Sequence, residues 1–348
     1  MPRSVLVTGG CGFIGSHCVR HWLRAHPQDR VFNLDLLTYA GNPQNLADVE
    51  GPDRQLAAAA RRYHFIHGDI CNTQLLDALF QEHRFELVVN FAAETHVDRS
   101  IISMTDFINT NIGGVRCLIE AVRTHRVPRF VHISTDEVYG SIPAGQAGED
   151  APLRPSNPYS SSKAAADLIV LSFIRTHRLP AIVIRGSNNY GTYQYPEKLI
   201  PLAISNLIEG RKIPVHGDGR HVRSWLHVQD FCEAIDCIAH RAPVHEVYNV
   251  AGEERTNLEL LALIAAKLKQ DLAQSKVHIN DRPGADPRYA PDGSKLRDIL
   301  GWAPARRLAT HLPEVVDWYL EHRDWWSAIR QKREFQDHYE RQSKGMWY

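Results

Sequence analysis

Tyr159 and Lys163 lie four residues apart, directly after Asn157-Pro158. Proline is favoured in the first turn of a helix, so both side chains are predicted to project from one helical face. An ammonium beside a phenol favours the phenolate, and we expect the pKa of Tyr159 to fall from about 10 toward neutrality. Such a phenolate can take a hydroxyl proton while a hydride leaves the same carbon. The pair predicts oxidation of an alcohol; the alternative is two unrelated residues on a helix surface.

A second group of reactive side chains, Thr135, Asp136 and Glu137, stands at the end of a predicted strand. The Thr135 hydroxyl can hydrogen-bond the substrate oxygen that Tyr159 deprotonates. Oxidation of an alcohol needs no carboxyl pair, so the two acids are surplus to that step, and the alternative is a solvated acidic turn. If both face the substrate, one can act as an acid and the other as a base. Elimination of water requires such a pair.

A glycine-rich loop directly follows the first predicted strand and opens the first predicted helix. Gly9, Gly12 and Gly15 match the pattern of a dinucleotide-binding loop, in which the backbone approaches a pyrophosphate at a helix N-terminus. The second predicted strand ends in Asp35, whose carboxylate can accept both ribose hydroxyl hydrogens and would repel a 2′-phosphate. No arginine adjoins Asp35. The loop and Asp35 therefore predict NAD as the cofactor rather than NADP.

Short apolar runs alternate with helix-length segments through the first half of the chain, as in an α/β protein with a doubly wound parallel sheet. The runs are apolar on both faces, which is typical of strands covered by helices on each side. Strand ends at Asp69-Ile70 and at Phe91, Ala92 and Ala93 are predicted to line the cofactor cleft. The predicted strands are 5–8, 31–35, 63–67, 87–91, 129–134 and 181–185, and the predicted helices are 13–25, 106–125 and 159–177.

The alternation ends after residue 185, where glycine, proline, asparagine and tyrosine are frequent over 186–201. We expect the later part to form a smaller C-terminal lobe over the carboxyl ends of the strands, where ligands bind. Residues 1–190 are predicted to form the Rossmann-type NAD-binding domain. The helical segment 229–240 and the run 247–250 place 228–250 back in that domain. Residues 191–227 and 251–348 are predicted to form the substrate-binding lobe.

The composition excludes several classes of protein. Forty Lys plus Arg balance forty Asp plus Glu, which argues against a nucleic-acid binder, and 43% hydrophobic residues argue against a disordered chain. No apolar run approaches the roughly 20 residues of a membrane-spanning helix, and the first residues do not resemble a secretory signal. Six scattered cysteines without a C-x-x-C pair indicate free thiols in a reducing cytoplasm. His17 and His21 are spaced like helix-borne metal ligands but lack a third ligand nearby in sequence, so no metal site is predicted.

With these residues assembled, the chain resembles the extended short-chain dehydrogenase/reductase family and, within it, the nucleotide-sugar 4,6-dehydratases. The glycine loop and the Tyr159–Lys163 pair mark the superfamily only. The triplet 135–137 and the segment through Pro201 are specific to the dehydratase branch. The similarity runs nearly end to end, through 37–42, 92–100, 135–137, 187–191, 196–201, 282–284 and 317–320.

The resemblance implies an NAD-dependent hydro-lyase that acts on a nucleotide sugar, with dTDP-glucose favoured. Tyr159, with Lys163 and Thr135, deprotonates the C4 hydroxyl while the C4 hydride reduces NAD⁺. Glu137 then abstracts the C5 proton and Asp136 protonates the departing C6 hydroxyl, so that water leaves. Hydride returns to C6, which gives a 4-keto-6-deoxy sugar and regenerates NAD.

The resemblance also assigns binding residues. For NAD these are Gly9, Gly12, Phe13, Ile14, Gly15, Asp35, Leu37, Thr38, Asp69, Ile70, Phe91, Ala92, Ala93, Thr110, Tyr159, Lys163 and Asn189. For the substrate they are Thr95, Thr135, Asn188, Lys198, Leu199, Arg223, Asn257, Arg288 and Tyr289, with the two arginines suited to the pyrophosphate. A homodimer through helices 106–125 and 159–177 is implied as well.

Three alternatives to this interpretation stay open. Ser224 and Ala285 stand where the family usually has Asp and His, in the region expected to contact the nucleotide, so the same chemistry on UDP-, GDP- or CDP-glucose is one. A nucleotide-sugar 4-epimerase is the second, since it shares the glycine loop and Tyr159–Lys163 but needs no acid pair. A non-catalytic NAD-binding sensor is the third, although such proteins typically lose the tyrosine or the lysine.

Overall fold

The computed structural model describes residues 3–57 and 60–347. Its main body is a seven-stranded parallel sheet in the order β10-β6-β5-β4-β1-β2-β3, which confirms the predicted fold class. The order reverses between β1 and β4, and the carboxyl edge of a sheet opens a crevice at such a point. The strands are β1 (Ser4–Thr8), β2 (Arg30–Asp35), β3 (Tyr63–His67), β4 (Leu87–Asn90), β5 (Phe130–Thr135), β6 (Ala181–Gly186) and β10 (Val247–Val250).

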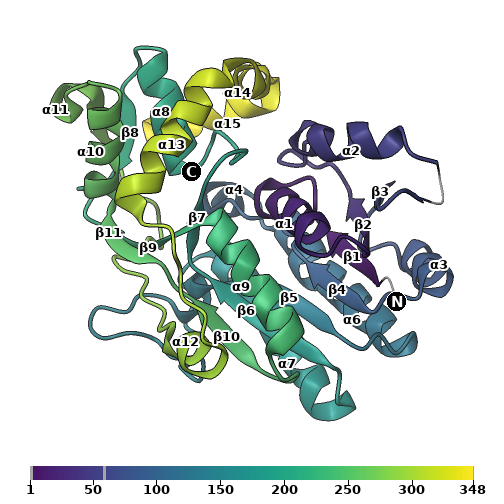
Figure 1. The fold of residues 1–348 in the computed structure, drawn as a ribbon. Coiled ribbons are helices and arrows are strands. Elements are labelled where there is room, and N and C mark those ends of the chain that lie inside the picture. The colour runs from purple at the N-terminus through teal and green to yellow at the C-terminus, as the bar shows by residue number, and fades with distance from the viewer. Residues whose placement is uncertain (1–2, 58–59, 348) are drawn as a thin grey trace.

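Helices cover both faces of this sheet (Figure 1). Adjacent strand residues point to opposite faces, so Val89 packs in a core with Trp22 and Ile235, while Val88 packs in another core with Ile119 and Val170. The first core lies under α1 (Phe13–Ala25), α9 (Val228–Arg241) and α12 (Ser294–Leu300), and the second under α3 (Thr73–His83), α6 (Val115–Thr124) and α7 (Pro158–His177).

A smaller lobe lies beyond the carboxyl ends of the strands and has a core of its own, which includes Tyr190, Ile204, Leu261 and Val316. It contains a three-stranded sheet of β7 (Asn188–Tyr190), β9 (Val222–His227) and β11 (Glu253–Thr256), and a two-stranded sheet of β8 (Ile213–His216) and β12 (Lys276–Ile279). Its helices are α8 (Leu199–Ile208), α10 (Asn257–Lys267), α11 (Leu272–Ser275), α13 (Leu308–Glu321), α14 (Arg323–Arg330) and α15 (Arg333–Lys344).

The packing of two elements differs from the predicted boundaries between main body and lobe. Strand β7, predicted within residues 1–190, pairs with β9 in the sheet of the lobe. Helix α12, predicted within the lobe, buries Leu296 and Leu300 in the core of the main sheet. In both cases the apolar side chains determine the packing. Tyr190 is buried in the core of the lobe, and the two leucines are buried in the core of the main sheet.

The helix predicted over 106–125 is interrupted. It begins as the short α5 (Thr105–Phe107), widens into the π-helix η3 (Ile108–Gly114) and continues as α6. The Asn111 side chain bonds both backbone groups of Glu94 and the Ser162 hydroxyl, at 2.8–3.0 Å. These contacts replace regular helix packing, and π-turns of this kind are frequent at functional sites. Further short helices in the described part of the chain are η1 (Pro43–Leu46), α2 (Ala47–Arg54), α4 (Val97–Ile102) and η4 (Asp136–Tyr139).

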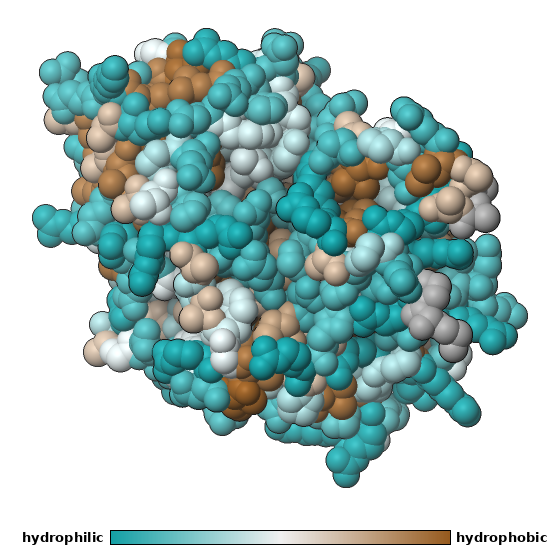
Figure 2. All heavy atoms as spheres, viewed as in Figure 1, coloured by the Kyte–Doolittle hydropathy of each residue, from teal (hydrophilic) through white to brown (hydrophobic). Residues whose placement is uncertain are grey.

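The surface is mainly polar on the face seen in Figure 2, with separate hydrophobic patches. Within residues 3–57 and 60–347, no helix combines the length and the apolar character needed to cross a membrane.

Candidate active site

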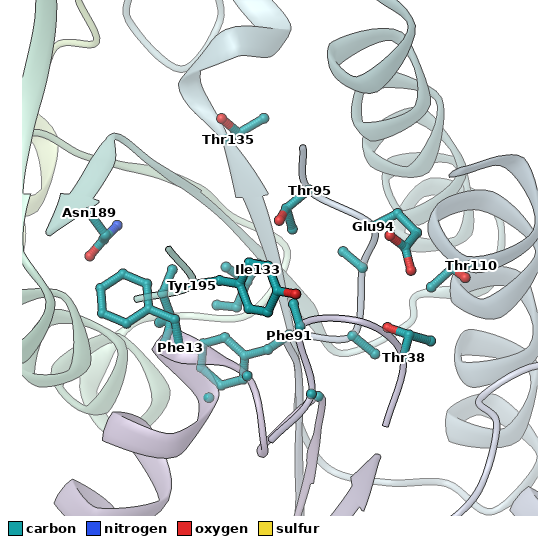
Figure 3. A pocket seen from close by; sticks show the side chains of 18 of the residues that line it. Phe13, Thr38, Phe91, Glu94, Thr95, Thr110, Ile133, Thr135, Asn189 and Tyr195 are labelled. Carbon is teal, nitrogen blue, oxygen red and sulfur yellow. The ribbon is translucent and has the colours of Figure 1, made fainter. Parts of the chain in front are cut away.

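One cavity extends from the glycine loop, past the carboxyl ends of the strands, to Lys198, which directly precedes α8 in the lobe. Figure 3 shows Phe13 and Phe91 on one side of it and Thr38, Glu94 and Thr110 gathered on another. The cavity brings together most of the predicted site residues: Gly9, Gly12, Phe13, Ile14, Gly15, Asp35, Thr38, Asp69, Ile70, Phe91, Ala92, Ala93, Thr95, Thr110, Thr135, Asp136, Glu137, Tyr159, Lys163, Asn188, Asn189 and Lys198.

The glycine loop is packed too tightly for side chains. Gly9 has a φ of +70°, and a Cβ on it would lie 2.7 Å from the backbone nitrogen of Ala92. A Cβ on Gly15 would lie 2.2 Å from the carbonyl oxygen of Gly9. Gly12 caps α1 without a side chain, so the amide groups of the first turn stay available to an anion. This cradle fits the pyrophosphate of a dinucleotide.

Asp35 ends β2 inside the cavity, and its carboxylate accepts hydrogen bonds from the backbone N–H groups of Cys11 and Leu37, both at 2.8 Å. Burial raises its pKa, and the two backbone hydrogen bonds oppose that shift. Among the described residues that line the cavity, the only Lys or Arg side chains are Lys163 and Lys198. The end of β2 therefore offers a ribose acceptor and no cation for a 2′-phosphate, which fits NAD. Leu37, predicted to bind the cofactor, does not line the cavity and instead supplies its N–H to Asp35.

Helix α7 positions Tyr159 and Lys163. It begins with a reciprocal cap, in which the Asn157 side chain accepts from the Ser160 N–H at 2.9 Å while the Ser160 hydroxyl accepts from the Asn157 N–H. The cap fixes the first turn, so Tyr159 and Lys163 are both buried and both line the cavity. The Lys163 ammonium donates to the carbonyl oxygen of Ile133 at 2.7 Å.

The expected fall in the pKa of Tyr159 is wrong for this structure. Burial raises that pKa, the Glu137 carboxylate raises it further, and the Thr135 hydroxyl opposes the shift only in part. Burial also lowers the pKa of Lys163 to about 8. Desolvation dominates the pKa of Tyr159, because burial removes the charged phenolate from water and the nearby carboxyl groups add repulsion.

The two carboxyl groups of the acid pair, Asp136 and Glu137, both line the cavity and both have raised pKa values. Thr135 ends β5, and its hydroxyl oxygen accepts from the Glu137 N–H at 3.3 Å, which opens the turn η4. Burial, and then repulsion by Glu137, raises the pKa of Asp136 to about 8. Burial raises the pKa of Glu137 as well, but the cations Arg223, Lys198 and Arg282 oppose that shift. Asp136 therefore keeps a proton at neutral pH. Arg223 opposes the shift at both carboxyl groups, and Lys198 and Arg282 act on Glu137 in addition.

Two predicted substrate residues lie beside this pair without lining the cavity. The Tyr289 hydroxyl donates to Asp286 at 2.9 Å and lies 3.4 Å from a Glu137 oxygen. The Arg223 guanidinium stacks on the Tyr289 ring, 4.2 Å from its centroid. Both side chains are therefore within reach of a ligand that extends past Glu137.

Three other predicted substrate residues are not brought into the cavity: Leu199, Asn257 and Arg288. The Arg288 guanidinium forms a two-fold ion pair with Glu254, at 2.9 Å for each bond, and donates to two backbone carbonyl groups. Its donors are thus engaged by groups of the protein in this structure, and its contact with the pyrophosphate stays a prediction. The Asn257 backbone donates to His221, while its side-chain oxygen is buried without a hydrogen-bond partner among the described residues.

Several cavity residues were missed from the sequence. Glu94 is the most notable, because burial, followed by repulsion from Asp106, raises its pKa to about 7. Glu94 and Tyr39 both lie inside sequence segments that carried the resemblance, so those segments were the available signal. The missed residues are Leu34, Leu36, Tyr39, Ala40, Gly41, Gly68, Glu94, Ile133, Ser134, Gly186, Ser187, Gln194, Tyr195, Glu197 and Phe231.

The two helix-face histidines have different partners and share no site. Nε2 of His17 lies 3.0 Å from the Thr192 carbonyl oxygen, and Nε2 of His21 lies 2.7 Å from the Asp236 carboxylate. His26 and His240 also contact Asp236, and the ligand atoms of these three residues lie within 4.8 Å of one another. The Arg3 guanidinium lies 2.6 Å from Nε2 of His240. A metal-binding histidine usually directs its other ring nitrogen to a hydrogen-bond acceptor, and a cation stands there instead.

The comparisons with known proteins agree with this geometry. Residues 6–315 match the family model described as GDP-mannose 4,6 dehydratase. The dTDP-glucose 4,6-dehydratase of Streptomyces niveus is 46% identical over 331 residues, which cover 94% of this chain and 95% of that protein. The chain belongs to the dTDP-glucose 4,6-dehydratase family.

Other members of the dTDP-glucose 4,6-dehydratase family agree in sequence and in structure. The Neisseria meningitidis protein is 44% identical and covers 94% of this chain, which covers 96% of it. The Streptomyces venezuelae enzyme, solved with NAD and dTDP bound, superposes with a TM-score of 0.88 at 43% identity, covering 94% of this chain and 99% of that one. A UDP-glucose 4-epimerase from Thermotoga maritima superposes with a TM-score of 0.82 at 26% identity. The fold alone therefore does not separate dehydratase from epimerase.

Proposed function

We propose that this chain is an NAD-dependent hydro-lyase that converts dTDP-glucose into dTDP-4-keto-6-deoxyglucose. The observation that carries the proposal is the acid pair, Asp136 and Glu137, in the same cavity as Tyr159 and Lys163. The pKa of Asp136 is raised to about 8, and more cations act on Glu137 than on Asp136. An epimerase needs only the tyrosine and the lysine. Carboxyl groups of opposite protonation state are what removal of water requires.

The cofactor site fits NAD, as the glycine cradle and Asp35 indicate. When bound, NAD supplies an acceptor for the C4 hydride of the sugar, positive charge in the cavity and the hydride that returns to C6. Tyr159 takes the proton of the C4 hydroxyl, and Thr135 orients that hydroxyl. Because burial and Glu137 raise the pKa of Tyr159, the phenolate needs a nearby cation as it forms. Lys163, four residues further along α7 in the same cavity, supplies it.

Elimination of water falls to the acid pair. A ketone at C4 acidifies the neighbouring C5 proton, which Glu137 takes as a base. Asp136 gives its proton to the C6 hydroxyl, which leaves as water while the C5–C6 double bond forms. The pKa of about 8 leaves Asp136 protonated, and able to act as an acid, at neutral pH.

The experiment is turnover of dTDP-glucose by the purified protein, followed by mass spectrometry of the sugar nucleotide. We expect a product lighter by one water. A product of unchanged mass, with inversion at C4, would identify an epimerase, and bound NAD without any product would identify a sensor.

A comparison of dTDP-, UDP-, GDP- and CDP-glucose tests the choice of base. Ser224 departs from the family pattern, but its hydroxyl is buried and accepts a hydrogen bond from the Gly252 N–H at 2.8 Å. The hydroxyl therefore binds the protein backbone. This supports dTDP-glucose, because the departure changes no group that faces a nucleotide. Ala285 likewise donates its backbone N–H within a turn, to Arg282.

The organisation of the chain completes the proposal. Residues 1–190 with 228–250 bind NAD, apart from β7, and residues 191–227 with 251–348 bind the nucleotide sugar, apart from α12. The protein is a homodimer through α5–η3–α6 and α7, where Ile108 and Leu168 are 46% and 58% exposed. Its six cysteines are free thiols, which supports a cytoplasmic location. The mass in solution tests the dimer, and a monomer would contradict it.

A further inference from the structure

Helix α15 packs against the part of the cavity wall formed by Tyr195, Glu197 and Lys198. It lies beyond residues 6–315, which match the family model. No residue of α15 lines the cavity among the described residues. The helix nevertheless contacts the wall through the buried Gln342 amide and the Phe335 ring.

Gln342 makes the most direct of these contacts. Its side chain is 2% exposed, and its amide N–H₂ donates to the backbone carbonyl oxygen of Glu197 at 3.1 Å and to the Asp98 carboxylate at 3.0 Å. Asp98 lies in the first turn of α4 and also pairs with Arg282 at 2.7 Å. One amide group thus joins α15 to the peptide that precedes Lys198 and to a buried carboxylate.

Further contacts hold the wall segment 195–198 against α15. Arg99 lies 3.0 Å from the Glu197 carboxylate and 2.9 Å from that of Glu334 in α15. The Phe335 ring of α15 packs against Tyr195, with centroids 6.2 Å apart. Glu197 is 1% exposed, so its charge depends on these partners for stabilisation.

The segment held in this way delivers Lys198 to the cavity. The Lys198 ammonium donates to the carbonyl oxygen of Thr95 at 2.8 Å, and both residues line the cavity. Lys198 is also one of the cations that favour the charged form of Glu137. A displacement of the peptide between Glu197 and Lys198 would therefore move a cation relative to the acid pair.

We propose that Gln342 is a positioning residue, which acts from α15 through the Glu197 carbonyl group to hold Lys198 in place for the substrate. The proposal rests on the proposed function only in taking Lys198 as a substrate contact. Gln342 touches neither substrate nor cofactor, and its effect passes through the backbone of the wall.

The test compares Gln342→Met with Gln336→Met in the full-length protein. Methionine is close to glutamine in length and lacks the donor, and Gln336 is an exposed residue of the same helix. We expect Gln342→Met to raise KM for dTDP-glucose by about tenfold, as for the loss of one charge-assisted hydrogen bond, with a smaller effect on kcat and no loss of bound NAD. Gln336→Met is expected to match the wild type.

Hydrogen exchange gives a readout that needs no substrate. We expect faster exchange in the peptide covering 194–198 in Gln342→Met, and wild-type exchange there in Gln336→Met. Equal exchange and equal KM in both variants would overturn the positioning role. If the wild-type protein did not convert dTDP-glucose, the proposed function would fail, while the exchange comparison would still decide whether Gln342 holds this wall.

Discussion

Replacing Asp136 by asparagine is expected to make the protein more stable and the enzyme slower. The pKa of this buried carboxyl is raised from 3.8 to about 8, so between these values the folded state binds more protons than the unfolded state. Stability therefore falls as pH rises through that window. At 1.36 kcal/mol per pKa unit, the cost between pH 5 and pH 8 is about 4 kcal/mol. Asparagine does not titrate, so the free energy of unfolding of the variant does not fall by this amount.

Urea unfolding of wild type and Asp136→Asn at several pH values measures the effect. The stability of the variant relative to the wild type is expected to increase from pH 5 to pH 8 and then to level off. Turnover of dTDP-glucose is expected to fall by roughly 10²–10⁴-fold, as for the loss of a general acid. Asp150→Asn, at an exposed position, serves as the control and leaves both quantities unchanged. Parallel stability profiles for wild type and Asp136→Asn would refute the reasoning about this carboxyl.

Three further variants test other parts of the structure. Tyr159→Phe removes the group that takes the C4 hydroxyl proton, so product formation from dTDP-glucose is expected to fall below detection while NAD stays bound; wild-type turnover would contradict this. Asp35→Asn weakens the ribose acceptor, and the affinity for NAD measured by calorimetry is expected to drop by about tenfold to a hundredfold; unchanged affinity would argue against the contact. Arg185→Met leaves the buried Asp167 carboxylate without its partner at 2.9 Å and is expected to cost about 3–5 kcal/mol in urea unfolding, whereas the exposed Arg175→Met costs little.

The strands of the main sheet and the glycine loop could be predicted because their signals are local. The five strands that the structure describes in the lobe were not predicted. The strands at 63–67 and 247–250 have the predicted bounds, since short runs of apolar and β-branched residues lie between polar turns. Helix α1 also has its predicted bounds, from Phe13 to Ala25. In each case the residues that define the element are neighbours in sequence.

The π-turn could not be predicted because it depends on contacts distant in sequence. Asn111 meets Glu94, 17 residues away, and Ser162, 51 residues away. Periodicity within 106–125 carries no trace of these partners. The same reason explains Arg288, whose pairing with Glu254 spans 34 residues of sequence.

The protonation state of Tyr159 could also not be predicted from the sequence. The Tyr159–Lys163 spacing predicts one electrostatic effect, but burial and Glu137 act on the same phenol and reverse its direction. Glu137, the neighbour of Asp136 in sequence, is itself a cause of the raised pKa of Asp136, so the direction of that shift was predictable from the sequence. Its magnitude depends on burial, which only the fold determines.

The central claim is that Asp136 and Glu137 remove water from a sugar that Tyr159 has helped to oxidise. The most direct measurement is mass spectrometry of dTDP-glucose after incubation with the double variant Asp136→Asn, Glu137→Gln, with bound NAD quantified in the same sample. The account predicts a normal NAD content and no product lighter by one water. Dehydrated product formed at the wild-type rate would contradict it.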